Sequence, residues 1–287
     1  MRGAAGSMTV LRPKNAREAL RLFARRPDAL PLAGGTDLMV AWNLGSLNNR
    51  VILDLSLLRE WSRITRTAHS LRLGALVTHA AAERHPLVRR HFGLLVQAAA
   101  TVGGIQIQER GTIAGNIANA SPAADTVPPL AVYDARVHLA SATGRRVVPV
   151  LEIFAGPKQT TLGPGELIEA IDLPFLEKAP GRQMFRKVGT RAAQAISKIV
   201  AAALLWTAKD GTITDVRVAL GSMAPTARRL REAESYLVGR RLGADTARQA
   251  AALLAEDVAP IDDVRSTASY RLATARRLLE GFLAPAV

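Results

Sequence analysis

The chain has 287 residues, of which 48% are apolar and 22% charged, and its formal net charge is +14 at pH 7. This length is sufficient for a buried core and predicts two domains. Cysteine is absent, which excludes disulfides, thiolate-held iron–sulfur clusters and thiol nucleophiles from this chain. No apolar run reaches the roughly 18 residues of a membrane span, and residues 1–7 lack the apolar core of a signal peptide, so we expect a cytoplasmic location.

The histidines give no sign of a metal site. His69, His79, His85, His91 and His138 form no HExxH-like pair. His79 and His85 fall in a predicted strand-to-helix region without carboxylates at ligand spacing. The sequence therefore predicts no metal ligands.

The positive charge is large enough for nucleic-acid binding, but its distribution argues against it. Basic pairs such as Arg25-Arg26 and Arg145-Arg146 are scattered along the chain, and there is no basic tail. Aromatic residues, on which bases would stack, make up only 4% of the chain. We therefore expect a solvated basic surface or a docking face for an acidic partner, and no nucleic acid.

The first elements are predicted by a capping signal and by apolar runs. Asn15 is a good N-cap, Glu18 follows three residues later, and an amphipathic run then predicts a surface helix. The apolar stretch 29–33 is interrupted by Gly34-Gly35-Thr36-Asp37 and resumes at 38–42. This pattern predicts a strand, a glycine turn and a short helix.

The middle of the chain mixes strand and helix patterns. Residues 51–55 and the alternating stretch 71–77 predict strands, and residues 87–100 have the periodicity of one helix. Residues 125–133 also look helical. Two further strands are expected around a Thr-Gly turn, over residues 136–140 and 146–150.

The last third begins after a predicted linker at 176–181, which contains proline and glycine. Residues 196–207 are strongly apolar, and Asp210-Gly211 predicts a hairpin turn before a second alternating strand. Three helical stretches follow, including 246–256 and 269–283. We therefore expect a sheet with helices packed on it.

Two glycine-containing polar loops, Gly34–Asp37 and Gly111–Asn116, share one chemical character. Their small residues let the backbone approach a ligand, and fanned backbone N–H groups can bind phosphate oxygens. Two such loops suit a pyrophosphate. Neither is a GxGxxG fingerprint or a P-loop, and each taken singly is more often a tight turn than a phosphate cradle.

Three motifs in this order resemble the flavoprotein subunit of the xanthine dehydrogenase and carbon monoxide dehydrogenase family. They are Leu32–Asp37, Thr112–Asn116 followed by Ala120–Asp125, and Lys187–Arg191 followed by Ala195–Lys198. The resemblance covers essentially the whole chain. It implies an α+β fold with a vanillyl-alcohol-oxidase (PCMH)-type FAD-binding domain over residues 1–176, in subdomains of about 1–57 and 58–176. A C-terminal α+β domain with a small antiparallel sheet would occupy residues 177–287.

The resemblance also implies which residues bind FAD. The two loops would hold the pyrophosphate, while Val102, Asp125, Leu167 and Lys187 would contact other parts of the cofactor. The implied set is Leu32, Ala33, Gly34, Gly35, Thr36, Asp37, Val102, Gly111, Thr112, Ile113, Ala114, Gly115, Asn116, Asp125, Leu167 and Lys187. Val102 and Leu167 fit a plain core equally well, and Asp125 also fits a helix N-cap.

Two positions bear on how closely the chain follows the family pattern. Ala114 stands where many relatives have glycine, and its methyl group would need room beside the pyrophosphate. Thr36-Asp37 is the pair of the xanthine-dehydrogenase-like members.

The function implied by the resemblance is that of an FAD-binding electron-transfer subunit of a heteromeric molybdenum hydroxylase, incomplete as an enzyme on its own. A large partner subunit would hold molybdopterin, and a small one two [2Fe–2S] clusters, in an (αβγ)2 assembly. Electrons would leave FAD for NAD⁺, a quinone, oxygen or another acceptor, near Arg191. Purines, N-heterocycles, aldehydes and carbon monoxide are all compatible substrates, and a stand-alone flavin oxidoreductase of the same fold is the alternative.

Overall fold

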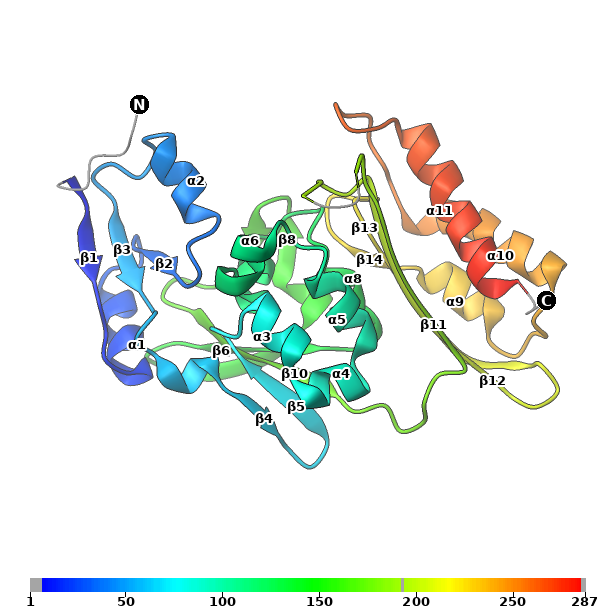
Figure 1. Ribbon diagram of the computed structural model, residues 1–287, viewed down its shortest axis with the longest axis horizontal. Helices are drawn as coiled ribbons and strands as arrows, with labels where there is room; N and C mark the ends of the chain where they lie inside the picture. The colour runs from blue at the N-terminus through cyan, green and yellow to red at the C-terminus, as the bar shows by residue number, and fades with distance from the viewer. Residues whose placement is uncertain (1–6, 192–193, 285–287) are drawn as a thin grey trace.

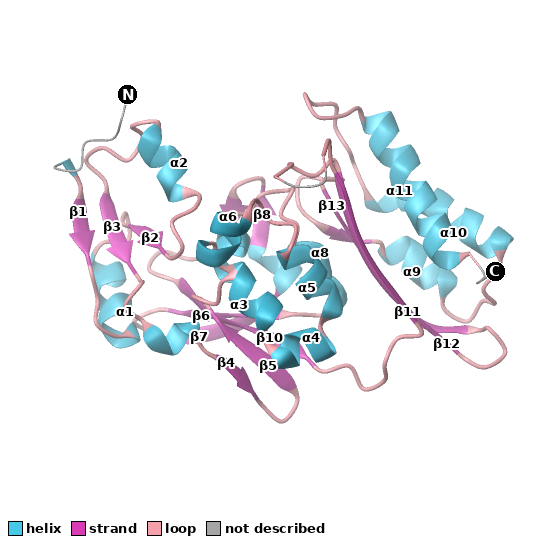
Figure 2. Cartoon of the chain, viewed as in Figure 1, coloured by secondary structure: helices cyan, strands magenta, loops and turns pink. Residues whose placement is uncertain are grey.

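The computed structural model describes residues 7–191 and 194–284, so six of the seven N-terminal residues considered above for a signal peptide lie outside the described ranges. Three units follow one another across the view of Figure 1: a small N-terminal sheet, a central unit of short helices on a sheet, and a C-terminal sheet covered by helices. The structure is a mixture of helices and strands, which confirms the α+β class (Figure 2). Among the described residues, no helix is long and apolar enough to cross a membrane.

The N-terminal unit is a parallel three-stranded sheet in the order β1-β3-β2 with one helix packed on it. The predicted N-cap is confirmed, because the Asn15 side chain accepts the N–H of Glu18 at 3.0 Å. The first glycine loop joins β2 to α2. The elements are β1 (Thr9–Leu11), α1 (Ala16–Arg25), β2 (Leu30–Leu32), α2 (Leu38–Asn43) and β3 (Val51–Asp54).

The central unit is an antiparallel five-stranded sheet in the order β4-β5-β10-β6-β7. Its strands are β4 (Ile64–Arg66), β5 (Ser70–Gly74), β6 (Arg136–Ala140), β7 (Arg145–Pro149) and β10 (Leu167–Pro174), and a separate hairpin pairs β8 (Phe154–Gly156) with β9 (Gln159–Thr160). Short helices cover it: η2 (Arg59–Ser62), α3 (His79–Arg84), α4 (Pro86–His91), α5 (Gly93–Ala99), α6 (Ile105–Arg110), α7 (Ile113–Ala118), α8 (Val127–Val132) and η3 (Val150–Ile153).

Two predictions in this unit were wrong in detail. The helix expected over 87–100 is broken at Phe92, which is fully buried and meets the Tyr133 ring edge-on at 5.1 Å, so tertiary packing overrides the helical periodicity. The polar loop expected over Gly111–Asn116 becomes the first turn of α7. Thr112 caps this helix by accepting the N–H of Gly115 at 2.9 Å, and Ile113 is buried in the core.

The C-terminal unit is an antiparallel sheet in the order β11-β12-β13-β14, with three helices on one face. Its elements are β11 (Arg182–Val188), β12 (Ile199–Thr207), β13 (Ile213–Gly221), β14 (Arg228–Arg229), α9 (Arg231–Leu237), α10 (Ala244–Asp257) and α11 (Ala268–Leu283). The sheet, the hairpin turn and the three helices were all predicted.

Strand β12 explains why its segment of the sequence is apolar without alternation. Ala201, Ala203 and Leu205 pack in the core shared with the C-terminal helices, whereas Ala202 and Leu204 pack in the core shared with the central unit. Successive side chains of a strand point to opposite faces, so a strand covered on both faces needs apolar residues at every position.

Helix α8 joins the central unit to the C-terminal sheet. All six of its residues are buried, and it packs against β12 and β13. Its last carbonyl oxygens are capped from β14 and β13: Arg229 donates to Ala131 O at 3.2 Å and Arg217 to Val132 O at 3.3 Å. Both guanidinium groups also pair with Asp134, at 3.1 and 2.7 Å. The two units are therefore fixed to each other beside the cavity described next.

Candidate functional site

The two glycine loops, far apart in the sequence, line one cavity of about 280 Å³. Gly34, Gly35 and Thr36 come from the β2–α2 connection, and Gly111 and Thr112 from the α6–α7 connection. The expectation that the two loops act together therefore has a structural basis: they share a wall of the same cavity.

Gly34 and Gly35 are required for different structural reasons. A Cβ atom on Gly34 would lie 1.8 Å from the carbonyl oxygen of Arg110, so this glycine lets the first loop pack directly on the backbone leading into the second. Gly35 has a φ of +77°, a conformation that L-residues with a side chain rarely adopt. Gly34 thus brings the loops together, and Gly35 turns the chain at the cavity wall.

The first loop offers backbone donors. Within residues 7–191 and 194–284, the N–H groups of Gly35, Thr36 and Asp37 have no protein acceptor. The hydroxyl of Thr112 in the second loop is already engaged as the helix cap. Unsatisfied N–H groups at a cavity wall are the donors that phosphate oxygens require, so the first loop has the chemistry of a phosphate site.

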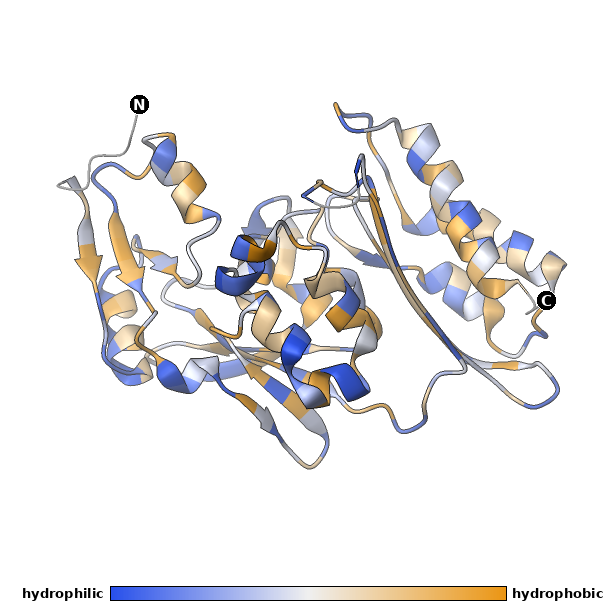
Figure 3. Ribbon diagram, viewed as in Figure 1, coloured by the Kyte–Doolittle hydropathy of each residue, from blue (hydrophilic) through white to orange (hydrophobic). Residues whose placement is uncertain are grey.

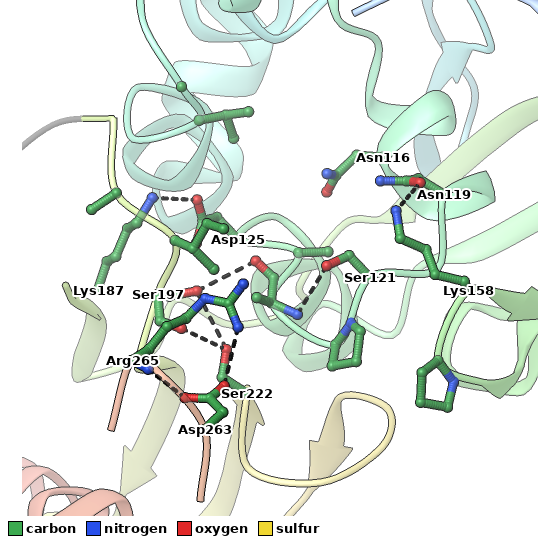
Figure 4. A pocket seen from close by; sticks show the side chains of 18 of the residues that line it. Asn116, Asn119, Ser121, Asp125, Lys158, Lys187, Ser197, Ser222, Asp263 and Arg265 are labelled. Carbon is green, nitrogen blue, oxygen red and sulfur yellow. Dashed lines mark hydrogen bonds and ion pairs between the residues drawn. The ribbon is translucent and has the colours of Figure 1, made fainter. Parts of the chain in front are cut away.

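A larger cavity of about 800 Å³ continues from the first one between the central unit and the C-terminal unit. The two share Asp37, Val102, Ile107, Asn116 and Asn119 as wall residues, so they adjoin each other. Figure 4 shows this space with Asn116, Asn119 and Lys158 on one side and Asp125 and Lys187 on the other. Its size and mixed polar and apolar lining suit a cofactor.

Asp125 and Lys187, expected as separate cofactor contacts, form an ion pair with each other. Lys187 Nζ lies 2.6 Å from Asp125 Oδ2 and also donates to Thr101 O at 2.8 Å, and the two side chains are only 9% and 10% exposed. Burial raises the pKa of Asp125, and the neighbouring Lys187 ammonium opposes that rise. The pair ties β11 to the central unit across the cavity wall.

One carboxylate oxygen of this pair has no hydrogen bond of normal geometry. Asp125 Oδ1 is buried and has no such donor among the described residues, although the Ser197 hydroxyl lies near enough to lower the pKa of the carboxyl. A buried acceptor without a donor is costly, so the site fits a ligand that supplies an N–H or O–H here. This orphaned oxygen, together with the free N–H groups of the first loop, shows that the residues present fit a nucleotide cofactor.

Other predicted contacts lie away from the cavity. Leu167 is 4% exposed in the core face of β10, and Leu32 ends β2 beside the first loop. Ile113 and Ala114 are both buried in the core, and neither is a wall residue of the smaller cavity. The structure therefore does not bring Leu167 to the cavity wall, and the core interpretation fits it better.

Arg191 is exposed, and its guanidinium donates to Gln194 O at 2.7 Å. It is not a wall residue of the two cavities, within the part of the chain that the structure describes. Its expected influence on the exit of electrons stays a prediction.

His79 is a wall residue that the sequence did not indicate. It is the first residue of α3, and its backbone N–H donates to Gly111 O at 3.0 Å, so the second loop is fixed to it. The residue is 2% exposed, its Nδ1 has no partner among the described residues, and burial lowers its pKa to about 4. The available signal was a polar side chain directly after a Thr N-cap in an otherwise apolar segment.

Comparison with known proteins decides the family. Residues 6–176 match the FAD binding domain in molybdopterin dehydrogenase, and residues 184–286 match the CO dehydrogenase flavoprotein C-terminal domain. The chain belongs to this family of FAD-binding dehydrogenase subunits. The resemblance seen in the three motifs is thereby confirmed, as are FAD as the cofactor of this chain and its role as an oxidoreductase subunit in molybdenum hydroxylases.

Individual relatives cover nearly the whole chain. The glyceraldehyde dehydrogenase medium chain of Sulfolobus acidocaldarius is 30% identical over 261 residues, which are 91% of this chain and 92% of that protein. The xanthine dehydrogenase FAD-binding subunit of Escherichia coli O157:H7 is 31% identical over 271 residues, 94% of this chain and 92% of that protein.

The fold of the family is confirmed by solved structures. A chain of quinoline 2-oxidoreductase from Pseudomonas putida 86 superposes with a TM-score of 0.90 at 26% identity, over 99% of this chain and 97% of that chain. A chain of carbon monoxide dehydrogenase from Hydrogenophaga pseudoflava gives a TM-score of 0.90 at 27% identity, over 96% of each chain.

Proposed function

We propose that this chain relays electrons from [2Fe–2S] clusters of a small partner subunit to an external acceptor, while a large partner subunit carries molybdopterin and the substrate. When bound, FAD supplies the redox chemistry, since a flavin exchanges electrons singly or in pairs. The two adjoining cavities between the glycine loops and the C-terminal unit carry this proposal. One offers phosphate donors and the other a buried ion pair.

The residues of this chain would bind, orient and shield the cofactor. The N–H groups of Gly35, Thr36 and Asp37 would donate to phosphate oxygens, and Asp125 Oδ1 would accept one hydrogen bond from the cofactor. The Lys187 ammonium would favour the ionised form of that carboxylate and so oppose the burial that raises its pKa. Val102 and Ile107 supply apolar wall to both cavities.

Exposed apolar surface beside the cavity supports a partner subunit. Helix α2 follows the first loop and has no buried residue, with Met39 49%, Val40 59% and Leu44 75% exposed. Figure 3 shows its apolar colour at the upper edge of the molecule instead of between layers. Contiguous apolar surface of this kind is typical of protein interfaces. We expect α2 to be covered in an (αβγ)2 complex, with the cytoplasm as the expected location.

An absorption spectrum of the purified chain, taken with and without its co-expressed partner subunits, tests the proposal. We expect non-covalent FAD at about one per chain after acid release, and iron–sulfur absorbance only when the partners co-purify. A flavin-loaded chain that neither binds partners nor exchanges electrons with them would favour the stand-alone oxidoreductase. A chain that refuses added FAD even with its partners present would overturn the proposal.

A further inference from the structure

His79 lies where the two glycine loops meet, yet its ring makes no hydrogen bond with any of residues 7–191 and 194–284. The residue is 2% exposed, and Nδ1 is buried without a partner among the described residues. A neutral imidazole carries one N–H donor and one acceptor nitrogen. Leaving such a group unpaired in the interior costs free energy, so its retention at a cavity wall points to a ligand that pairs with it.

The ring and the Thr36 hydroxyl converge on one place in the cavity. A Cβ atom on Gly111 would lie 3.4 Å from Cδ2 of His79 and 3.2 Å from Oγ1 of Thr36. The imidazole edge and the hydroxyl therefore flank the second loop at its first glycine, Gly111. The backbone bond from His79 N to Gly111 O fixes this relation, because it ties the start of α3 to the second loop.

The position within the cavity selects the part of the cofactor that His79 can reach. His79 lines the smaller cavity together with the donor N–H groups of the first loop, and it is not a wall residue of the larger one. Asp125, Lys187 and the C-terminal residues line the larger cavity. His79 therefore lies beside the unpaired N–H groups of the first loop, which suit phosphate oxygens.

We propose that His79 hydrogen-bonds a phosphate oxygen of the FAD pyrophosphate through a ring N–H and so positions the cofactor. The inference rests on the proposed FAD-binding function. It assigns a cofactor contact to a residue that lies outside both glycine loops. Burial keeps the ring neutral near pH 7, since its pKa is lowered to about 4. A neutral ring needs only one acceptor for its N–H, and a phosphate oxygen supplies it.

The test measures ligand affinity with three probes on the flavin-depleted complex. FAD and ADP both contain a pyrophosphate, whereas riboflavin contains none. We expect His79→Leu to weaken FAD and ADP by about 10- to 100-fold, because one hydrogen bond to a charged group is lost, and to leave riboflavin affinity unchanged. His79→Gln, which keeps an N–H donor, should recover most of the loss.

The controls distinguish a lost contact between His79 and the cofactor from misfolding of the variant and from failure of FAD binding by the unaltered chain. His69→Leu changes an exposed histidine on the β4–β5 connection and should alter none of the three affinities. Thermal unfolding of the His79 variants shows whether they are folded, and the ³¹P resonances of bound FAD should shift in His79→Leu. Unchanged FAD affinity in His79→Leu, or an equal loss for FAD and riboflavin, would overturn the inference while FAD binding by the unaltered chain still stands. Failure of the unaltered chain to bind FAD would instead remove the proposed function.

Discussion

The two glycine loops look alike in the sequence but differ in the structure. The first leaves the N–H groups of Gly35, Thr36 and Asp37 without acceptors in the described part of the chain, and it runs into the exposed helix α2. The second has its Thr112 hydroxyl engaged as a helix cap and sends Ile113 into the core. Both loops line the same cavity, but similar glycine and threonine content is embedded differently in them, because the helix after the first loop is exposed and the helix after the second is partly buried.

The largest expected effect comes from separating the two loops. In Gly34→Ala, the new methyl group would lie 1.8 Å from Arg110 O, so the backbone of one loop must move. We expect a loss of at least about 3 kcal/mol in the free energy of unfolding, together with loss of FAD. Urea unfolding and flavin content measure both. Gly144→Ala is the matched control, since a Cβ there meets nothing within 4 Å; equal behaviour of the two variants would show that the loops need not touch.

The pH dependence of stability tests whether the His79 ring, beside the second loop, is shielded from water as the structure indicates. Burial lowers its pKa from 6.5 to about 4, so between these values the unfolded chain binds more protons than the folded one. Stability should therefore fall as the pH drops from about 6.5 to 4, by up to about 3 kcal/mol. Urea unfolding should show a shallower fall in His79→Gln. A fall as steep as in the unaltered chain would mean that the ring is solvated.

Removing the cap of the second loop should affect the fold and spare the ligand. Thr112→Val keeps the shape of the side chain and loses the acceptor for Gly115 N–H. We expect a loss of about 1 kcal/mol in the free energy of unfolding and little change in FAD affinity. Thermal unfolding and a flavin titration distinguish the two effects. A variant of unchanged stability with much weaker FAD binding would assign Thr112 to the ligand.

The smallest effect on stability is expected beyond the first loop. Val40 on α2 is 59% exposed, so Val40→Asp should change the free energy of unfolding by no more than about 0.5 kcal/mol. The same change should weaken association with the partner subunits, because it puts a charge on an apolar interface. Size-exclusion chromatography of the co-expressed complex measures this. Arg26→Ala, on the exposed end of α1, serves as the control and should leave the complex intact.

Much of the local structure was predictable because its signals lie in neighbouring residues. Asn15 and Glu18 predicted α1, the Thr-Gly and Asp-Gly pairs predicted two hairpins, and the strongly apolar stretch 196–207 belonged to the expected sheet with helices packed on it. The family followed from three short motifs in order. These features depend on backbone preferences and hydrophobic burial within one element, which the sequence expresses directly.

The tertiary structure decided how distant residues use one another. Phe92 breaks a helix because it packs on Tyr133, and Asp125 pairs with Lys187 from a strand 62 residues further along. His79 reaches the cavity because α3 is bonded to the second glycine loop. The periodicity of the sequence predicts which side chains are buried. The partner of each buried polar group is decided only when the elements pack together, because each such group then needs a hydrogen bond from the protein or from a ligand.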